Sequence, residues 1–310
     1  MPSPPASNSV TRPLDAMAAA IVVVLCLSWG FNQVSTKLAI HDIPPLTQAA
    51  IRSVVAALLI GGWCRLRGIP MLARDGTLVA GIVAGVLFAA EFILIYQGLL
   101  YTTATRAVLF IYLAPFFVVI GARWLFPGDR FGPMQWIGLL MAFAGMLTAF
   151  GVPAPASSPH QLIGDLMMAA AALSWAATTL VIKASPLARV SPEKTLLYQI
   201  VLCVPIVGFG ALMFGERIAT MPSALAFGSL AYQTVVIGTT FSLWFALIVK
   251  FSASRLSAFT FLTPLFGVAA GHLVLGEPLT PAFALAVALV AGGLILVNRP
   301  RSLAPAKGSP

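Results

Sequence analysis

Glu91 stands out among the residues that could do chemistry, because it is the only carboxylate near the centre of a long apolar segment. A charged acid at that depth in hydrocarbon costs on the order of 2.5–3.5 kcal/mol. Two roles would justify its presence. Glu91 could bind the amino group of a small molecule or exchange a proton, or it could be a protonated or hydrogen-bonded side chain that fixes its own helix.

Polar side chains also gather beside a tryptophan in two apolar segments. Between residues 28 and 36 they occupy neighbouring helical faces, with Ser28, Asn32 and Ser35 on one face and Trp29, Gln33 and Thr36 on the next. The second segment repeats this pattern more sparsely, with Ser174, Trp175, Thr178 and Thr179. Polar groups are expensive in hydrocarbon, so these faces could line a water-filled cavity, or they could form hydrogen bonds between packed helices.

Aromatic residues close to these faces complete a candidate binding site. Tyr and Trp can stack on an apolar or aromatic ligand, although both are also common in membrane packing and at interfaces. The candidate substrate contacts are Trp29, Asn32, Gln33, Glu91, Tyr96, Tyr112, Trp175, Thr178 and Trp244.

Three further residues are unusual inside apolar segments. Arg52 lies about six residues inside its segment, and its long stem can carry the charge to the membrane interface, which favours an anchor or ion-pair role over substrate contact. Pro115 and Pro264 each remove a helix hydrogen bond and so kink a helix. Such a pair could act as hinges, or as fixed bends that improve packing.

Other catalytic or metal chemistry has no support in the sequence. There is no G-x-S-x-G or HExxH motif, the three histidines are scattered, and no lysine follows a glycine as a P-loop requires. The three cysteines lack CxxC spacing and lie in or beside apolar runs. We therefore expect no enzyme activity, no metal site and no cofactor.

The elements that position these residues are membrane helices. Of 310 residues, 59% are hydrophobic and only 9% are charged, against about a quarter charged in an ordinary soluble domain. So few charged residues exclude a soluble enzyme. They also exclude a nucleic-acid-binding domain, which the net charge of +9 alone would suggest. Breaks rich in Pro, Gly and Arg separate ten predicted spans, at residues 16–38, 46–64, 77–100, 106–126, 134–151, 162–184, 195–215, 223–249, 256–275 and 280–298.

The placement of Lys and Arg predicts the orientation of the bundle. With the N-terminus inside, fourteen of the 18 basic residues fall in cytoplasmic segments and three fall outside. This favours cytoplasmic N- and C-termini in a bacterial inner membrane. It also explains the positive charge as attraction to anionic membrane lipids rather than to nucleic acid.

An internal repeat divides the chain into two halves. Ser28-Trp29 with Lys37 recurs as Ser174-Trp175 with Lys183, and Leu113-x-Pro115 recurs as Leu262-x-Pro264. Each half holds five spans, so the second half must be inverted in the bilayer. Inverted repeats are the architecture of many secondary transporters, whose site lies near the midplane between the halves. By this register Thr240 is the equivalent of Glu91, which makes the site asymmetric and suits a polar substrate with one cationic end.

These residues together resemble the drug/metabolite transporter superfamily, specifically its ten-helix EamA-type exporters. The resemblance rests on Ser28-Trp29-Gly30-Phe31-Asn32 with Lys37, Pro44-Pro45 followed by Arg52, the stretch Glu91–Pro115, and Gly276-Glu277-Pro278-Leu279. It covers about residues 14–298. Gly128-Asp129-Arg130 departs slightly from the Gly-Glu-Arg typical of the family. The resemblance implies a secondary exporter of amino acids or similar metabolites.

The sequence thus predicts an all-α membrane protein with a disordered tail (1–12), a first five-helix repeat (13–151), a linker (152–161), a second repeat (162–299) and a second disordered tail (300–310). The expected partners are membrane lipids, a small-molecule substrate such as an apolar or aromatic amino acid, and protons if Glu91 couples transport to them. A drug or cation efflux carrier of the same fold, and a substrate channel, are the alternatives.

Overall fold

The computed structural model describes residues 14–299, and within that range it contains helices and connecting loops without strands. The tails predicted at 1–12 and 300–310 lie outside the described residues. Ten helical segments are long and apolar enough to cross a membrane. Their ends agree with the predicted spans to within three residues. The prediction of an all-helical membrane protein is therefore confirmed.

Seven of these segments are continuous helices. They are α1 (Ala16–Ala39), α2 (Pro45–Leu66), α3 (Leu78–Gly98), α6 (Pro133–Phe150), α7 (Pro159–Ala184), α8 (Pro192–Met213) and α13 (Pro281–Asn298). Five of them begin with a proline, which fits the first helical turn because the N–H group it lacks has no partner there. A short 3₁₀ helix, η1 (Pro186–Arg189), follows α7.

The other three spans are broken. The fourth consists of α4 (Ala104–Ile111) and α5 (Ala114–Leu125), and the ninth of α11 (Ala253–Phe259) and α12 (Leu262–Leu275). The eighth consists of α9 (Ala224–Val236), a π-helical turn η2 (Ile237–Phe241) and α10 (Ser242–Lys250). Pro115 and Pro264 lie in the first turns of α5 and α12. The helix breaks just before them are the kinks that these prolines predict. The π turn was not predicted from the sequence.

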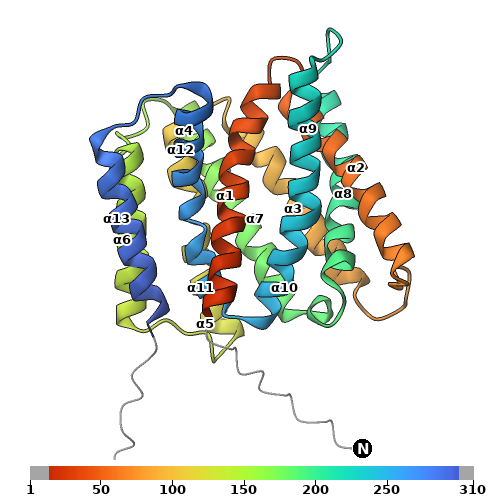
Figure 1. Ribbon diagram of the computed structural model, residues 1–310, viewed down its shortest axis with the longest axis horizontal. Helices are drawn as coiled ribbons and strands as arrows, with labels where there is room; N and C mark the ends of the chain where they lie inside the picture. The colour runs from red at the N-terminus through yellow and green to blue at the C-terminus, as the bar shows by residue number, and fades with distance from the viewer. Residues whose placement is uncertain (1–13, 300–310) are drawn as a thin grey trace, which may run out of the picture.

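The helices form a bundle in which both ends of the described chain lie at the same end (Figure 1). We call the end that holds Leu14 and Arg299 the near end, and the opposite one the far end. In Figure 1, α6 and α13 pack together at one side of the bundle, while α2 and α8 lie at the other side, with α1 and α3 between them. Large apolar side chains such as Leu58 and Trp124 are exposed on the outer surface, as expected where lipid replaces water.

Close helix contacts depend on glycine at the α6–α13 interface. A Cβ atom on Gly138 would lie 2.6 Å from the carbonyl oxygen of Gly293, and one on Gly293 would lie 2.5 Å from the carbonyl oxygen of Gly138. No side chain fits at either position without moving a backbone. Small residues at such crossings let membrane helices approach closely, which makes this pair a rigid part of the bundle.

Candidate functional site

A cavity of about 440 Å³ lies inside the bundle. Its wall is built by residues of α1, α2, α3, α4, α5, α7, α9, η2 and α12 and of the short segments that follow α3, α4 and α11. It extends from the middle of the bundle, at the level of Ala114 and Trp175, to the far end, where Leu99 and Ala104 are exposed. A space of this size is within the range typical of small-molecule sites.

Seven of the nine predicted substrate contacts line this cavity. They are Trp29, Asn32, Gln33, Glu91, Tyr96, Tyr112 and Trp175. The structure thus brings together side chains from both halves of the sequence, and polar residues of α1 line the cavity.

Thr178 and Trp244 are not on the wall. Thr178 is buried and its hydroxyl donates to the carbonyl oxygen of Ser174 on its own helix, 2.9 Å away. Trp244 is 1% exposed and packs behind the wall, with its ring 5.4 Å from that of Trp29 and 5.7 Å from that of Trp175. Both residues support the site from behind, because their helices turn these positions away from the cavity.

Arg52 also lies on the wall, although its sequence position favours an anchor or ion-pair role near the membrane interface. It is 3% exposed, lines the cavity and does not reach an interface. Its guanidinium carbon lies 4.8 Å from the centre of the Phe92 ring, and Nη1 donates to Oε1 of Gln233 at 3.4 Å. The signal that could have found it is its depth, since an arginine six residues inside a span is a functional candidate by default.

Four polar atoms of wall residues have no hydrogen-bond partner within residues 14–299. They are Nε of Arg52, Oε2 of Glu91, Oδ1 of Asn32 and Oγ1 of Thr263, and all four are buried. Arg52 and Glu91 also form no ion pair with each other in that range. The wall residues therefore hold one cationic donor, two acceptors and one hydroxyl that no protein group within residues 14–299 satisfies.

The aromatic rings of the wall form a continuous set with Phe88, which is buried behind them. Trp29 contacts Phe241 with 5.6 Å between ring centres, Phe241 contacts Phe88 at 5.6 Å, and Phe88 contacts Phe92 at 5.0 Å. Phe92 in turn stacks on Tyr96 at 6.2 Å. Such a surface suits an apolar or aromatic side chain.

The π turn joins the wall to the polar face of α1. Nε1 of Trp29 donates to Oγ1 of Thr240 at 2.9 Å, and that hydroxyl donates to the carbonyl oxygen of Val236. Thr240 is the residue that the repeat register aligns with Glu91. Because π turns in membrane helices free backbone groups and recur at functional sites, η2 provides a local departure from helical geometry directly at the cavity.

Polar contacts link the helices at the near end, below the cavity. Nζ of Lys183 on α7 donates to the carbonyl oxygens of Ile248, at 2.8 Å, and of Phe251. Asp129, in the loop after α5, accepts hydrogen bonds from the hydroxyl of Ser252 and the backbone N–H of Ser254. These bonds tie α7, α10, α11 and the loop after α5 together.

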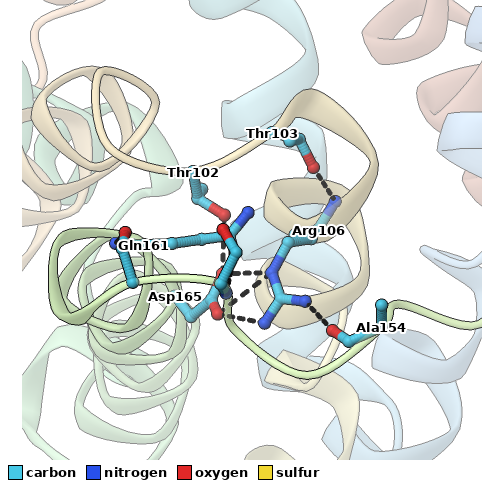
Figure 2. Close-up of polar contacts among 8 residues, drawn as sticks. Thr102, Thr103, Arg106, Ala154, Gln161 and Asp165 are labelled. Carbon is cyan, nitrogen blue, oxygen red and sulfur yellow. Dashed lines mark hydrogen bonds and ion pairs between the residues drawn. The ribbon is translucent and has the colours of Figure 1, made fainter.

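A buried ion pair lies beside the cavity at the far end (Figure 2). Arg106 on α4 binds Asp165 on α7, with Nε 3.0 Å from Oδ1 and 3.1 Å from Oδ2, and Nη2 also contacts Oδ2. The hydroxyl of Thr102 donates to Oδ1 at 2.6 Å, and Nη1 of Arg106 donates to the carbonyl oxygen of Ala154 in the loop before α7. The pair fixes α4 to α7 and to the loop that joins the two halves.

A second ion pair at the far end is exposed. Nζ of Lys37, at the end of α1, lies 2.6 Å from Oε1 of Glu277, just after α12. Their side chains are 62% and 45% exposed, so this contact adds little stability.

Comparison with known proteins agrees with this geometry. Residues 16–151 and 162–299 each match the EamA-like transporter family. The chain belongs to the EamA-like transporter family. Membership in this family, together with the ten apolar helices, indicates a multi-pass membrane transporter.

Individual relatives cover nearly the full length of the chain. It is 28% identical over 286 residues to "Uncharacterized transporter YvbV" of Bacillus subtilis, covering 90% of this chain and 91% of that protein. It is 25% identical over 294 residues to a "Probable amino-acid metabolite efflux pump" of Escherichia coli, covering 91% and 94%. A solved crystal structure with 20% identity superposes with a TM-score of 0.76 over 91% of this chain and 96% of its own, which shows a shared fold.

Proposed function

We propose that this EamA-family member is a secondary carrier that exports amino acids, including apolar or aromatic ones, or similar small metabolites, by alternating access across a bacterial inner membrane. The observation that carries the proposal is the cavity itself. It reaches the far end of the bundle, stops at the middle, and is lined by opposite charges together with aromatic rings. A carrier needs such a site, accessible from one side at a time.

The helix contacts support two inverted repeats, 13–151 and 162–299. α2 packs on α8 and α6 on α13, which are equivalent spans of the two halves. α3 packs on α7 just as α1 packs on α9, and α1 packs on α12 just as α7 packs on α5. Each contact is matched by its repeat equivalent, as a two-fold axis in the membrane plane requires.

The basic residues support the proposed orientation. Near-end segments carry most of the Lys and Arg, which is typical of the cytoplasmic side by the positive-inside rule. The cavity then faces the periplasm in this conformation. Export requires the opposite state, in which the contacts of Lys183 and Asp129 at the near end open.

The test is counterflow in proteoliposomes that contain the purified protein. Vesicles loaded with unlabelled phenylalanine should accumulate labelled phenylalanine transiently, because a carrier exchanges one molecule for another. A channel equilibrates the label without accumulation, which would contradict the proposal. The same assay with a pH gradient separates proton-coupled from facilitated transport, and competition by lipophilic cations tests the drug-efflux alternative.

A further inference from the structure

The cavity holds an arginine and a glutamate that do not neutralise each other. Buried opposite charges gain most by pairing directly, since a charge left unpaired in a low-dielectric site is costly. Arg52 and Glu91 share one cavity wall, yet within residues 14–299 they make no ion pair, and Nε of Arg52 and Oε2 of Glu91 are buried without partners. A ligand bound between Arg52 and Glu91 would supply the hydrogen-bond partners that both side chains lack.

A chain of amide groups holds the Arg52 guanidinium in its position. Nε2 of Gln48 donates to the carbonyl oxygen of Ile43 at 2.7 Å, which fixes the amide and turns its Oε1 toward Gln233. Nε2 of Gln233 donates to that Oε1 at 2.9 Å, so Oε1 of Gln233 points to Nη1 of Arg52. Both glutamines are fully buried. The face of Phe92 bounds the guanidinium on another side. Arg52 lines the cavity, and its Nε has no partner within residues 14–299.

The unpartnered atoms define the chemistry of the missing group. Nε of Arg52 needs an acceptor, and a planar guanidinium prefers a carboxylate. Oε2 of Glu91 and Oδ1 of Asn32 both need donors, and an ammonium group supplies three. A molecule that carries one carboxylate and one ammonium supplies both an acceptor for Arg52 and donors for Glu91 and Asn32. The hydroxyl of Thr263, also without a partner, can donate or accept and so does not discriminate between ligands. An amine leaves Arg52 without an acceptor, and a carboxylic acid leaves Glu91 and Asn32 without donors.

From this arrangement we propose that Arg52 and Glu91 read the two charges of a zwitterion, with Arg52 binding the carboxylate and Glu91, helped by Asn32, binding the ammonium group of a free α-amino acid. The aromatic rings on the wall, those of Trp29, Phe241, Phe92 and Tyr96, then face its side chain. This assignment rests on the proposed function, in which the cavity is the substrate site. It makes Arg52 a specificity-determining residue and excludes simple amines as good ligands.

The test compares three ligands of the same ring and similar length. Binding of phenylalanine, phenethylamine and 3-phenylpropionate is measured by thermal shift and calorimetry on the full chain in detergent. The native protein should bind phenylalanine about 10- to 100-fold more tightly than either analogue, because each analogue leaves a buried charged group unpaired. Leucine and isopentylamine repeat the comparison for an aliphatic side chain.

Single variants test which residue binds the carboxylate and which binds the ammonium group of the amino acid. Arg52→Gln should weaken phenylalanine about 10- to 100-fold while phenethylamine changes little, so that the preference collapses. Glu91→Gln should likewise weaken phenylalanine binding about 10- to 100-fold, while the binding of 3-phenylpropionate changes little. Arg52→Lys keeps the charge in case Arg52→Gln does not fold, and should retain part of the preference. The control is Arg123→Gln, which removes an exposed arginine from α5 and should change no ratio.

Two outcomes would overturn the proposal: native protein that binds phenethylamine as tightly as phenylalanine, or an Arg52→Gln protein that keeps the native ratio. These are separable from failure of the proposed function. If amino-acid counterflow is absent but the binding ratios hold, the carrier assignment fails and the zwitterion site stands. If counterflow occurs and the ratio survives Arg52→Gln, the transport function stands and the role of Arg52 is wrong.

Discussion

Arg106 and Asp165 form a buried, multidentate ion pair that joins α4 to α7 at the far end of the cavity. Their side chains are 10% and 2% exposed, so neither partner could be solvated if the other were lost. Because Ala104 and Ala107, on the same helix as Arg106, line the cavity, the pair also sets the position of that wall.

Removing one partner of this pair should be strongly destabilising. Asp165→Asn or Arg106→Gln is expected to cost about 3–5 kcal/mol, because a buried charge is left uncompensated. Unfolding temperature in detergent is the measurement. The double variant Arg106→Leu/Asp165→Leu should be less destabilised than either single variant, and a double variant as unstable as the sum of the two would contradict this account.

The ion pair between Asp75 and Lys194 should make stability depend on acid. Nζ of Lys194 lies 2.6 Å from Oδ2 of Asp75, in the loop before α3, and this hydrogen bond, with one from Thr77, lowers the Asp75 pKa from 3.8 to about 2. The native state therefore favours ionised Asp75, so its contribution is present above pH 4 and is lost as the pH falls toward 2.

Unfolding temperatures measured from pH 7 down to pH 2.5 test this directly. Asp75→Asn should lower the unfolding temperature at pH 7 and reduce its fall between pH 4 and pH 2.5. Glu193→Gln, which removes a neighbouring carboxylate that forms no ion pair within residues 14–299, serves as the control. An Asp75→Asn protein with the full native acid dependence would show that the pair does not contribute.

The contacts of Lys183 should hold the near end closed. Lys183→Ala removes the donor to the carbonyl oxygens of Ile248 and Phe251. It is expected to raise near-end opening at least about 10-fold, because even one hydrogen bond to a charged group contributes about 1.5–3 kcal/mol. The reporter is Ser257→Cys in a background without the native cysteines. Ser257 is fully buried, and by the repeat register it is the equivalent of Val108 on the cavity wall.

Thiol labelling of Ser257→Cys in detergent measures the opening, since both ends are then accessible to the reagent. The control is Lys250→Ala, which removes an exposed lysine from the last turn of α10 at the same end. Equal labelling rates with and without Lys183 would mean that this lysine does not close the near end.

Trp175 and Thr178 give a matched pair on one helix. Trp175 lines the cavity, whereas Thr178 is buried away from it and bonds to Ser174. Trp175→Ala should therefore weaken phenylalanine binding about 3- to 10-fold through the lost ring contact, while Thr178→Val should leave affinity nearly unchanged. Calorimetric dissociation constants decide it. If Thr178→Val weakens binding as much as Trp175→Ala, the cavity wall has been assigned to the wrong face of α7.

The sequence predicted most of the fold because its signals are local. Ten apolar runs of membrane-spanning length end at Pro, Gly and Arg, and the helices of the structure begin and end there. The breaks beside Pro115 and Pro264 were likewise predicted, since proline cannot donate its hydrogen bond inside a helix. Glu91, Trp29 and Asn32 were found because polar groups are conspicuous in apolar segments.

Tertiary structure alone decided which faces of these helices meet the cavity. Residue type and helical spacing do not show which polar or aromatic positions of a helix face the cavity, so Trp244 and Thr178 could not be told apart from Trp29 and Trp175. The direction of Arg52 depends on Gln233, 181 residues away in the chain, and on Gln48 and Phe92, which hold it inside rather than at the interface. The length and polarity of each segment are properties of nearby residues, whereas the pairing of charges and rings around a cavity is a property of helices brought together from both halves.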